Sequence, residues 1–483
     1  MLLGIPSDVK RFFRPVTSTL SKPISKALAP MVLAFLLAPH YRRLKTIAGM
    51  VVEHRVHVGT ISRRLVNPLW TTRDWYSELA QTTLNFTNRY ERTVIIGRKR
   101  NWMMIFDSTY HSSVGRVMQN LMETSTRKDS RRRNTKQHVF VMGIIITERG
   151  VRIPVPRRSY HTQAYCKEHG KKYRTQAQLI AIMIREAMIP KDVDVTVVYD
   201  SAFDADIIHK KSRKRGFREV FPLDPNRNLA EGDQSYSPAK VNSPVVQSTL
   251  DWDEKEFAKI ELEVNNEDFV SLRRRHIDNL RVKKTFRRYM VAARRVAVSK
   301  LGDCLVVTSY KENPNIELLE GQSGDWSEYR VELAKRRKKD NKKPSRWIGK
   351  VLACTDTAAT ARQVIEWYEL RWQIEIFFRE LKSRMQLGCY VLMMFEAVER
   401  YLDILLMGFL LLEKQRLASL ESKSAKMPEQ GDPVHHWRTT DRLRALEHSM
   451  QTLNVEFIRE KVKTKRGQNE LLKALEHQLC QVA

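Results

Sequence analysis

The strongest helical pattern in the chain lies at 367–389, where no proline occurs and the first glycine is Gly388. Apolar residues recur there at helical spacing, which predicts an amphipathic helix with one buried stripe. A polar row lies beside the stripe and consists of Tyr368, Arg371, Glu375 and Lys382. Gaps of three, four and seven residues place all four on one side of the same helix. Such a row is either a solvated face with weak ion pairs or a surface for phosphates and a metal ion.

Upstream, two short apolar runs end in a carboxylate. Residues 102–106 run directly into Asp107, and residues 193–199 run into Asp200. A carboxylate just past a buried strand lies at the edge of a sheet, where ligands and metals commonly bind. Each Asp taken alone could equally be a helix cap or a turn residue. Asp204 and Asp206 lie near the second position, but only Asp200 directly follows its strand.

The other patterns between residues 138 and 354 predict an α/β unit with an interruption. Strands are expected at 138–147, 151–156 and 216–223, helices at 175–188 and 202–214, and a hairpin turn at 148–150. A polar linker then begins near 228, followed by strand-like runs at 289–298 and 304–310 and a strand at 347–354. The basic segments 127–136 and 335–343 are either mobile surface loops or phosphate contacts.

The two ends of the chain read as helical. Within residues 1–95, a helix over 44–55, a turn at 56–60 and a helix over 61–65 capped by Thr60 resemble a helix-turn-helix. A plain helical hairpin with a basic rim fits the same pattern. The cations that would contact DNA in the first case are Arg42, Arg43, Lys45, Arg63 and Arg64. Residues 391–412 and 441–483 predict further helices.

Charge and cysteine content narrow the class of protein. The 483 residues include 85 Lys and Arg against 55 Asp and Glu, a net charge of +30, which points to a polyanionic partner such as nucleic acid. The five cysteines form no CxxC pair, so neither a zinc site nor a disulfide framework is expected, and a reduced, cytoplasmic protein is the simplest interpretation. The apolar runs 27–38 and 402–412 are too short to span a bilayer.

The row Tyr368, Arg371, Glu375 and Lys382 resembles the YREK signature of bacterial DDE transposases of the insertion sequence family 4 type, in all four residues and all three gaps. The resemblance implies a ribonuclease H-like α/β core over 96–228 and 346–390, with a β-rich insertion at 229–345. It also implies an α-helical DNA-binding domain at 1–95 and a helical C-terminal region at 391–483. In that family the Glu completes an Asp-Asp-Glu triad, so the resemblance assigns Asp107, Asp200 and Glu375 as metal ligands.

The resemblance further implies cut-and-paste transposition with Mg²⁺, for which Mn²⁺ would substitute, since oxygen ligands favour these ions over zinc. Tyr368, Arg371 and Lys382 would orient DNA phosphates, and a homodimer would hold two element ends. Trp347 is either a core residue or a platform that stacks on a flipped base. Two other functions fit the same residues: a metal-dependent nuclease without strand transfer, and a catalytically silent DNA-binding protein.

Overall fold

The computed structural model describes most of the α/β core and part of each end of the chain. The described residues are 5–37, 58–66, 71–95, 97–112, 118–124, 135–224, 227, 229–230, 254–264, 285–312, 347–383, 385–388, 390, 392–423 and a few between 458 and 472. The basic segment 335–343, nearly all of 127–136, and Arg42, Arg43 and Lys45 lie outside them.

Eleven strands of the described chain form one mixed sheet, in the order β2-β3-β1-β5-β6-β11-β10-β9-β7, with β4 paired to β3 and β8 to β9. Their bounds are β1 Arg100–Ser112, β2 Met122–Thr124, β3 Thr135–Ile146, β4 Arg152–Ser159, β5 Val193–Val198, β6 Arg218–Pro222, β7 Leu229–Ala230, β8 Ala258–Val264, β9 Thr285–Val298, β10 Gly302–Glu312 and β11 Trp347–Cys354.

Parallel pairing is confined to the centre of this sheet. Strands β1 and β5 run parallel, as do β5 and β6, whereas β3, β4 and β11 join antiparallel. The predicted turn between β3 and β4 is present, with Gly150 at a positive φ of 71° that suits glycine. Strands β9 and β10, which lie in the segment predicted as a β-rich insertion, continue the core sheet through β11, because β10 pairs with β11 over eight residues.

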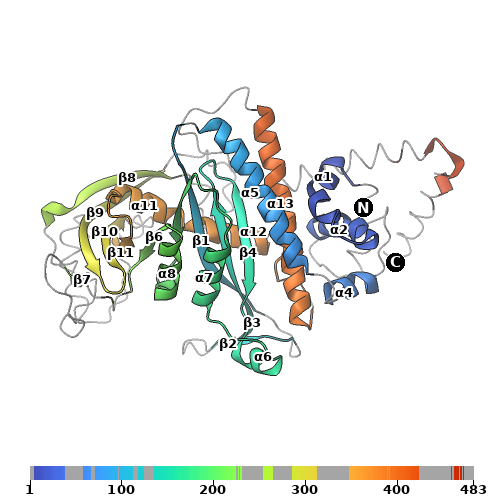
Figure 1. Ribbon diagram of the computed structural model, residues 1–483, viewed down its shortest axis with the longest axis horizontal. Coiled ribbons are helices and arrows are strands. Elements are labelled where there is room, and N and C mark those ends of the chain that lie inside the picture. Colours follow the sequence, from blue (N-terminus) through green and yellow to red (C-terminus); the bar gives the residue numbers. More distant parts are fainter. Residues whose placement is uncertain are drawn as a thin grey trace, which may run out of the picture.

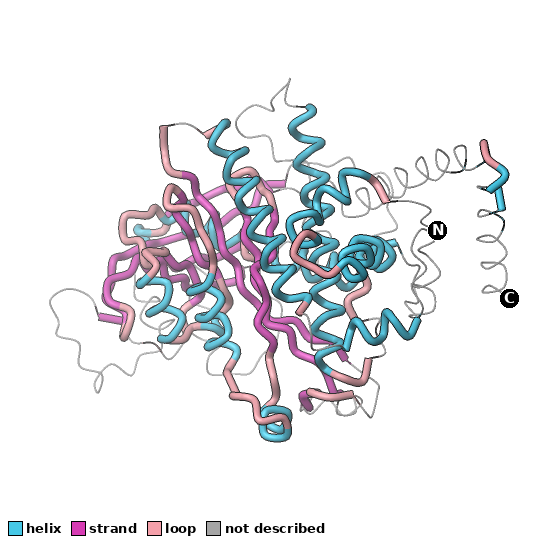
Figure 2. The backbone as a smooth tube through the Cα atoms, turned by 45° about the vertical axis from the view of Figure 1, so that its right-hand side comes forward, coloured by secondary structure: helices cyan, strands magenta, loops and turns pink. Residues whose placement is uncertain are grey.

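Helices cover the sheet and build a second body beside it (Figure 1). Helices α7 and α8 lie over one face, and α11 and α12 lie over the other. The long helices α5 and α13 run side by side, and α1, α2 and α4 pack around them (Figures 1 and 2). The bounds are α1 Ser7–Thr17, α2 Lys22–Leu37, α4 Val58–Val66, α5 Thr72–Val94, α6 Gln163–Glu168, α7 Gln176–Glu186, α8 Asp206–Lys214, α11 Ala361–Glu369, α12 Trp372–Ser383 and α13 Phe395–Lys423.

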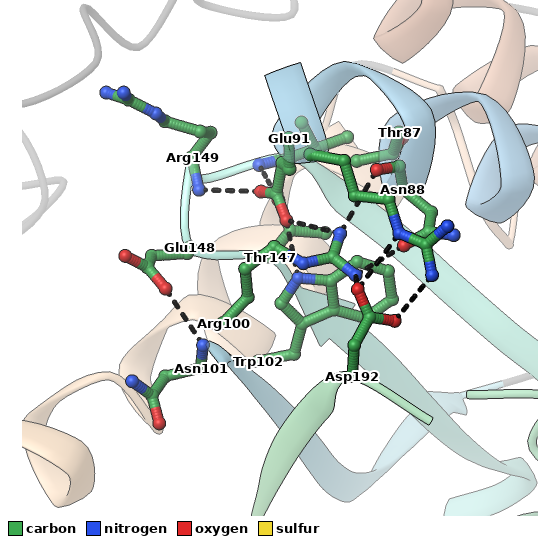
Figure 3. A network of polar contacts seen from close by, with 12 residues as sticks. Thr87, Asn88, Glu91, Arg100, Asn101, Trp102, Thr147, Glu148, Arg149 and Asp192 are labelled. Atoms are coloured by element: carbon green, nitrogen blue, oxygen red, sulfur yellow. Dashed lines mark hydrogen bonds and ion pairs between the residues drawn. The ribbon is translucent and has the colours of Figure 1, made fainter. Parts of the chain in front are cut away.

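A buried polar network fixes the start of β1 (Figure 3). The fully buried carboxylate of Glu91, on α5, accepts hydrogen bonds from Trp102 Nε1 at 2.6 Å and from the Arg149 backbone N–H at 2.9 Å. The buried guanidinium of Arg100 lies 3.7 Å from Glu91 and 2.7 Å from Asp192, which directly precedes β5. The network therefore joins α5, β1, the β3–β4 turn and β5 at one end of the sheet.

Three predicted boundaries are wrong. The strand at 102–106 extends to Ser112, because residues 108–112 continue to pair with β3, so Asp107 lies inside the strand. Helix α4 begins at Val58, which places residues 58–60 in the helix and not in a turn. The helix expected at 202–214 begins at Asp206, after a short 3-10 turn at Ser201–Phe203.

The single helix predicted within 367–389 is also wrong, because the segment is divided between α11 and α12, and α12 ends at Ser383. At the junction the backbone N–H groups of Arg371, Gln373 and Ile374 donate to carbonyls three residues back, and this tighter pattern breaks the α-helical ladder. Leu370, assigned to the buried stripe, is 38% exposed there. No helix within the described part of the chain has the length and apolarity needed to cross a membrane.

Candidate active site

Asp107 and Asp200 lie at the same level of the sheet because of the register between their strands. Ile105 pairs with Val198 in the parallel ladder of β1 and β5, and each Asp follows its paired residue by two positions. Strand β5 ends at Val198, while β1 continues to Ser112 in its pairing with β3. Each carboxylate also accepts a hydrogen bond from the next backbone N–H, at 2.7 Å for Asp107 and 2.9 Å for Asp200. Adjacent parallel strands thus deliver two carboxylates to one point.

Glu375 reaches the same place from α12, which packs against β1. Arg371 connects it to the strand, since its guanidinium lies 2.8 Å from Glu375 Oε1 and 3.5 Å from Asp107 Oδ2. The Arg371 side chain is 13% exposed, against 22% for Asp107 and 35% for Glu375. The cation therefore lies partly buried between two of the carboxylates.

The charges of Asp200 and Glu375 both affect the pKa of Asp107 and of Arg371, so all three carboxylates lie near one another. Burial raises the pKa of Asp107 to about 6, and the charges of Asp200 and Glu375 add to the increase, while the Ser108 N–H and Arg371 oppose it. For Arg371, burial disfavours the charge, but Tyr368, Asp200, Glu375 and Asp107 outweigh it, so its pKa is raised. The site gathers negative charge around one guanidinium.

The acidic residues after β5 differ in their burial and in their ion pairs. The Asp204 carboxylate is fully buried against Arg227 and His209, with His209 Nε2 at 2.9 Å. Burial alone would raise the pKa of Asp204, but hydrogen bonds from His209 and Arg227 lower it to about 2. Asp206 pairs with Arg227 and Lys300. Both are occupied away from the Asp107 side chain, so Asp200 alone of the three joins the cluster.

Tyr368 lies on α11, and Lys382 lies on α12 with Glu375. Tyr368 is buried at the end of α11, where its hydroxyl accepts a hydrogen bond from Lys350 Nζ at 3.0 Å. Lys382 lies on the last turn of α12. Its ammonium is near His111 of β1, since burial first and Lys382 second lower the pKa of that imidazole. Of the four side chains, Arg371 and Glu375 are joined by an ion pair.

The remaining predicted residues lie elsewhere. The Trp347 backbone is the first residue of β11, opposite Glu312, and its side chain is outside the described set. Arg63 and Arg64 are on α4, whose buried Ile61 and Leu65 face the helical body. Arg63 is exposed, whereas burial lowers the pKa of the Arg64 guanidinium. Helix α4 packs against α13.

Sequence reasoning missed the cations that surround Tyr368. Lys350 of β11 and Lys311 of β10 were counted only in the overall charge. Lys350 was detectable as a Lys within an otherwise apolar strand (WIGKVLAC), although its side chain is exposed in the structure. The identity of its partner depends on the packing of α11 on the sheet, which no local pattern contains.

The three carboxylates, Asp107, Asp200 and Glu375, are suitable ligands for a divalent cation. Three carboxylates that repel one another and gather around a cation are the oxygen donors that Mg²⁺ and Mn²⁺ prefer. Among the described residues, no three His, Cys, Asp or Glu side chains already form a metal-binding cluster. The chemistry of the donors fits the ions, and Arg371 neutralises the same carboxylates.

Comparison with known protein families finds a match over the part of the chain that carries Asp200, Arg371 and Glu375. Residues 171–407 match the family model described as Transposase DDE domain. The matched segment includes Asp200, Arg371 and Glu375 and begins after Asp107. No curated protein matches the sequence. A DDE domain implies a ribonuclease H-like fold, DNA as the partner and a divalent metal ion as the cofactor.

Proposed function

From a chain whose residues 171–407 form a transposase DDE domain, we propose a cut-and-paste transposase of the insertion sequence family 4 type. It would cleave the ends of its element and join them to target DNA. The observation that carries the proposal is the convergence of Asp107, Asp200 and Glu375 on Arg371. The YREK spacing supports the narrower family assignment, and a homodimer that pairs two ends is part of the proposal.

In this proposal Asp107, Asp200 and Glu375 hold two Mg²⁺ or Mn²⁺ ions, which would activate a water or 3′-hydroxyl and stabilise the leaving oxygen. Arg371 balances the carboxylates without metal, and its planar fork suits bidentate contact with a phosphate once they are otherwise neutralised. Tyr368 and Lys382 would orient the DNA backbone, and Trp347 would stack on a displaced base. Residues 1–95, with Arg42, Arg43, Lys45, Arg63 and Arg64, would bind the element ends.

The test is a strand-transfer assay with purified protein. A labelled duplex carrying the genomic sequence that flanks the gene is incubated with a supercoiled plasmid, in Mg²⁺ or in EDTA. We expect Mg²⁺-dependent cleavage at the element boundary and labelled product joined to the plasmid. Cleavage without joining would favour a nuclease, and binding without cleavage would favour a silent DNA-binding protein.

Matched variants connect the activity to the carboxylates. Asp107→Ala and Glu375→Gln should each lower cleavage on the order of a thousandfold, because metal-ion catalysis supplies several kcal/mol and each 1.36 kcal/mol is tenfold in rate. Asp206→Asn is the control, since this acidic residue lies close in sequence to Asp200 but pairs with Arg227 and Lys300. Full cleavage by either active-site variant would refute the catalytic assignment.

A further inference from the structure

Strands β9, β10 and β11 present one face to helix α11, and basic residues gather on it. Tyr289 pairs with Lys311, and Lys311 pairs with Ile348. Because side chains alternate along a strand, the residues two positions away, Arg287 and Lys350, share that face. Figure 1 shows α11 lying beside these strands. Three neighbouring strands thus bring three cations to the end of one helix.

The contacts of these cations centre on two consecutive residues of α11. Glu369 forms ion pairs with Arg287 and with Lys311, the latter at 3.3 Å. Lys350 Nζ donates to the Tyr368 hydroxyl and lies 4.8 Å from the centroid of that ring. Within the described residues, Lys350 forms no ion pair with a carboxylate. Among the described residues, three cations therefore face a single carboxylate, so positive charge is in excess there. We call Arg287, Lys311, Lys350, Tyr368 and Glu369 the basic shelf.

The cations of the basic shelf repel one another, which affects the pKa of Lys311. Burial, opposed by Glu369, lowers the pKa of Lys311, and the charges of Arg287 and Lys350 contribute to the decrease. Burial would raise the pKa of Glu369, but Lys311 and Arg287 lower it. A cluster of cations is held together here by one carboxylate, an arrangement that a second anion would stabilise.

The basic shelf adjoins the carboxylate cluster. The Arg371 backbone N–H donates to the Tyr368 carbonyl at 3.0 Å, and Tyr368 is among the groups that raise the Arg371 pKa against the opposing effect of burial. Arg371 in turn bridges Asp107 and Glu375. The excess positive charge therefore lies directly next to the proposed site of cleavage, on the side of the inserted strands.

We infer that the basic shelf binds a DNA phosphate next to the scissile one, and that Lys350 is its principal contact. Lys350 donates to Tyr368, which leaves the hydroxyl hydrogen of Tyr368 free to point at a phosphate oxygen. Lys350 thus acts both through its own charge and by positioning that hydroxyl. Strands β9 to β11 then do more than extend the sheet, because they supply part of the DNA-binding surface. The inference rests on the proposed function.

Its test measures DNA affinity with EDTA present, so that no strand is cut. The variant Lys350→Met keeps the aliphatic stem and removes the charge, and Lys350→Arg keeps the charge. The control is Lys259→Met on β8, because Lys259 pairs with Met290 and so lies on the opposite face of the sheet. The probe is the labelled duplex with the genomic flanking sequence, titrated between 50 and 300 mM NaCl.

Loss of one phosphate contact should make the slope of log K against log salt shallower by about 0.9 for duplex DNA. At 0.15 M salt this corresponds to about fivefold weaker binding. We expect that change for Lys350→Met, with little change for Lys350→Arg and Lys259→Met. An unfolding midpoint equal to that of the wild type would show that Lys350→Met is folded. Equal slopes for Lys350→Met and wild type would overturn the inference.

A second measurement locates the contact. Neutral methylphosphonates are placed singly at each phosphate within three nucleotides of the cleavage site. One substitution should weaken the wild-type protein but leave Lys350→Met unaffected, and identical profiles would contradict the inference. Because binding is measured without metal, a failure of cleavage refutes the proposed function alone, whereas an unchanged slope refutes the basic shelf alone.

Discussion

Replacing Glu91 with Ala should destabilise the fold strongly, because its carboxylate organises the buried network at the start of β1 (Figure 3). The change removes the acceptor of Trp102 Nε1 and of the Arg149 backbone N–H, and it takes a negative charge from Arg100. Arg100 retains Asp192 at 2.7 Å and the Asn88 carbonyl at 3.1 Å. The loss is therefore of two buried hydrogen bonds and of one of two ion pairs.

These contacts determine how much the Glu91→Ala change should lower the free energy of unfolding. A buried donor left without an acceptor costs about 1–3 kcal/mol, and breaking a buried ion pair costs about 3–5 kcal/mol. Because the effects share one carboxylate they are not additive, and Asp192 still neutralises part of the charge on Arg100. We expect Glu91→Ala to lower the free energy of unfolding by about 3–5 kcal/mol. Glu91→Gln, which keeps an acceptor oxygen, should cost less.

Urea unfolding followed by circular dichroism measures the effect. The control is Glu78→Ala, an exposed Glu on the same helix, which should change the free energy by about 0.5 kcal/mol or less. The Glu91→Ala effect should persist in 0.5 M NaCl, since salt screens buried pairs little. A loss below about 1 kcal/mol, or a larger loss for Gln than for Ala, would refute the argument from buried contacts.

Two other predictions concern Gly388 and His209. Gly388→Ala should lower thermal stability by about 1–3 kcal/mol, because the new Cβ would lie 2.1 Å from the His111 ring at a φ of 102°; Gly170→Ala, also at positive φ but in open space, is the control and should cost less. Burial opposes the charge of His209, but Asp204 and Glu219 outweigh it and raise its pKa, with Arg227 and Tyr199 also in contact. The stability that charged His209 provides is therefore complete below its unfolded pKa of about 6.5 and is lost as pH rises through the folded value. The difference in unfolding free energy between wild type and His209→Gln should shrink from pH 6 to pH 9, and a constant difference would contradict the assignment.

Local patterns predicted the central elements because each of them is decided by nearby residues. The run WMMIF is buried whichever sheet it joins, and Thr175 caps α7 through a capping box with Gln178. The end of β1 was not predictable in the same way. Residues 108–112 are mostly polar, and they remain a strand because β3 pairs with them, which is a contact between segments about 30 residues apart.

The sequence indicated the candidate residues, but it did not indicate the contacts that bring them together in the folded protein. Asp107 and Asp200 each follow an apolar run, a local signal, but their common level depends on the pairing of Ile105 with Val198. The sequence could not separate Asp200 from Asp204 by chemistry. That separation comes from Arg227 and His209, which occupy Asp204 in the folded protein.

The break between α11 and α12 gives the YREK spacing a different meaning from the one a single helix would have. A continuous helix would point Tyr368 and Arg371 to one side, since they lie three residues apart. In the structure Tyr368 is held by Lys350 of β11, while Arg371 reaches Asp107 of β1. The signature therefore joins two parts of the sheet. Its first residue is held by β11, its middle two residues lie at the carboxylates, and the spacing is a constraint on a turn between two helices.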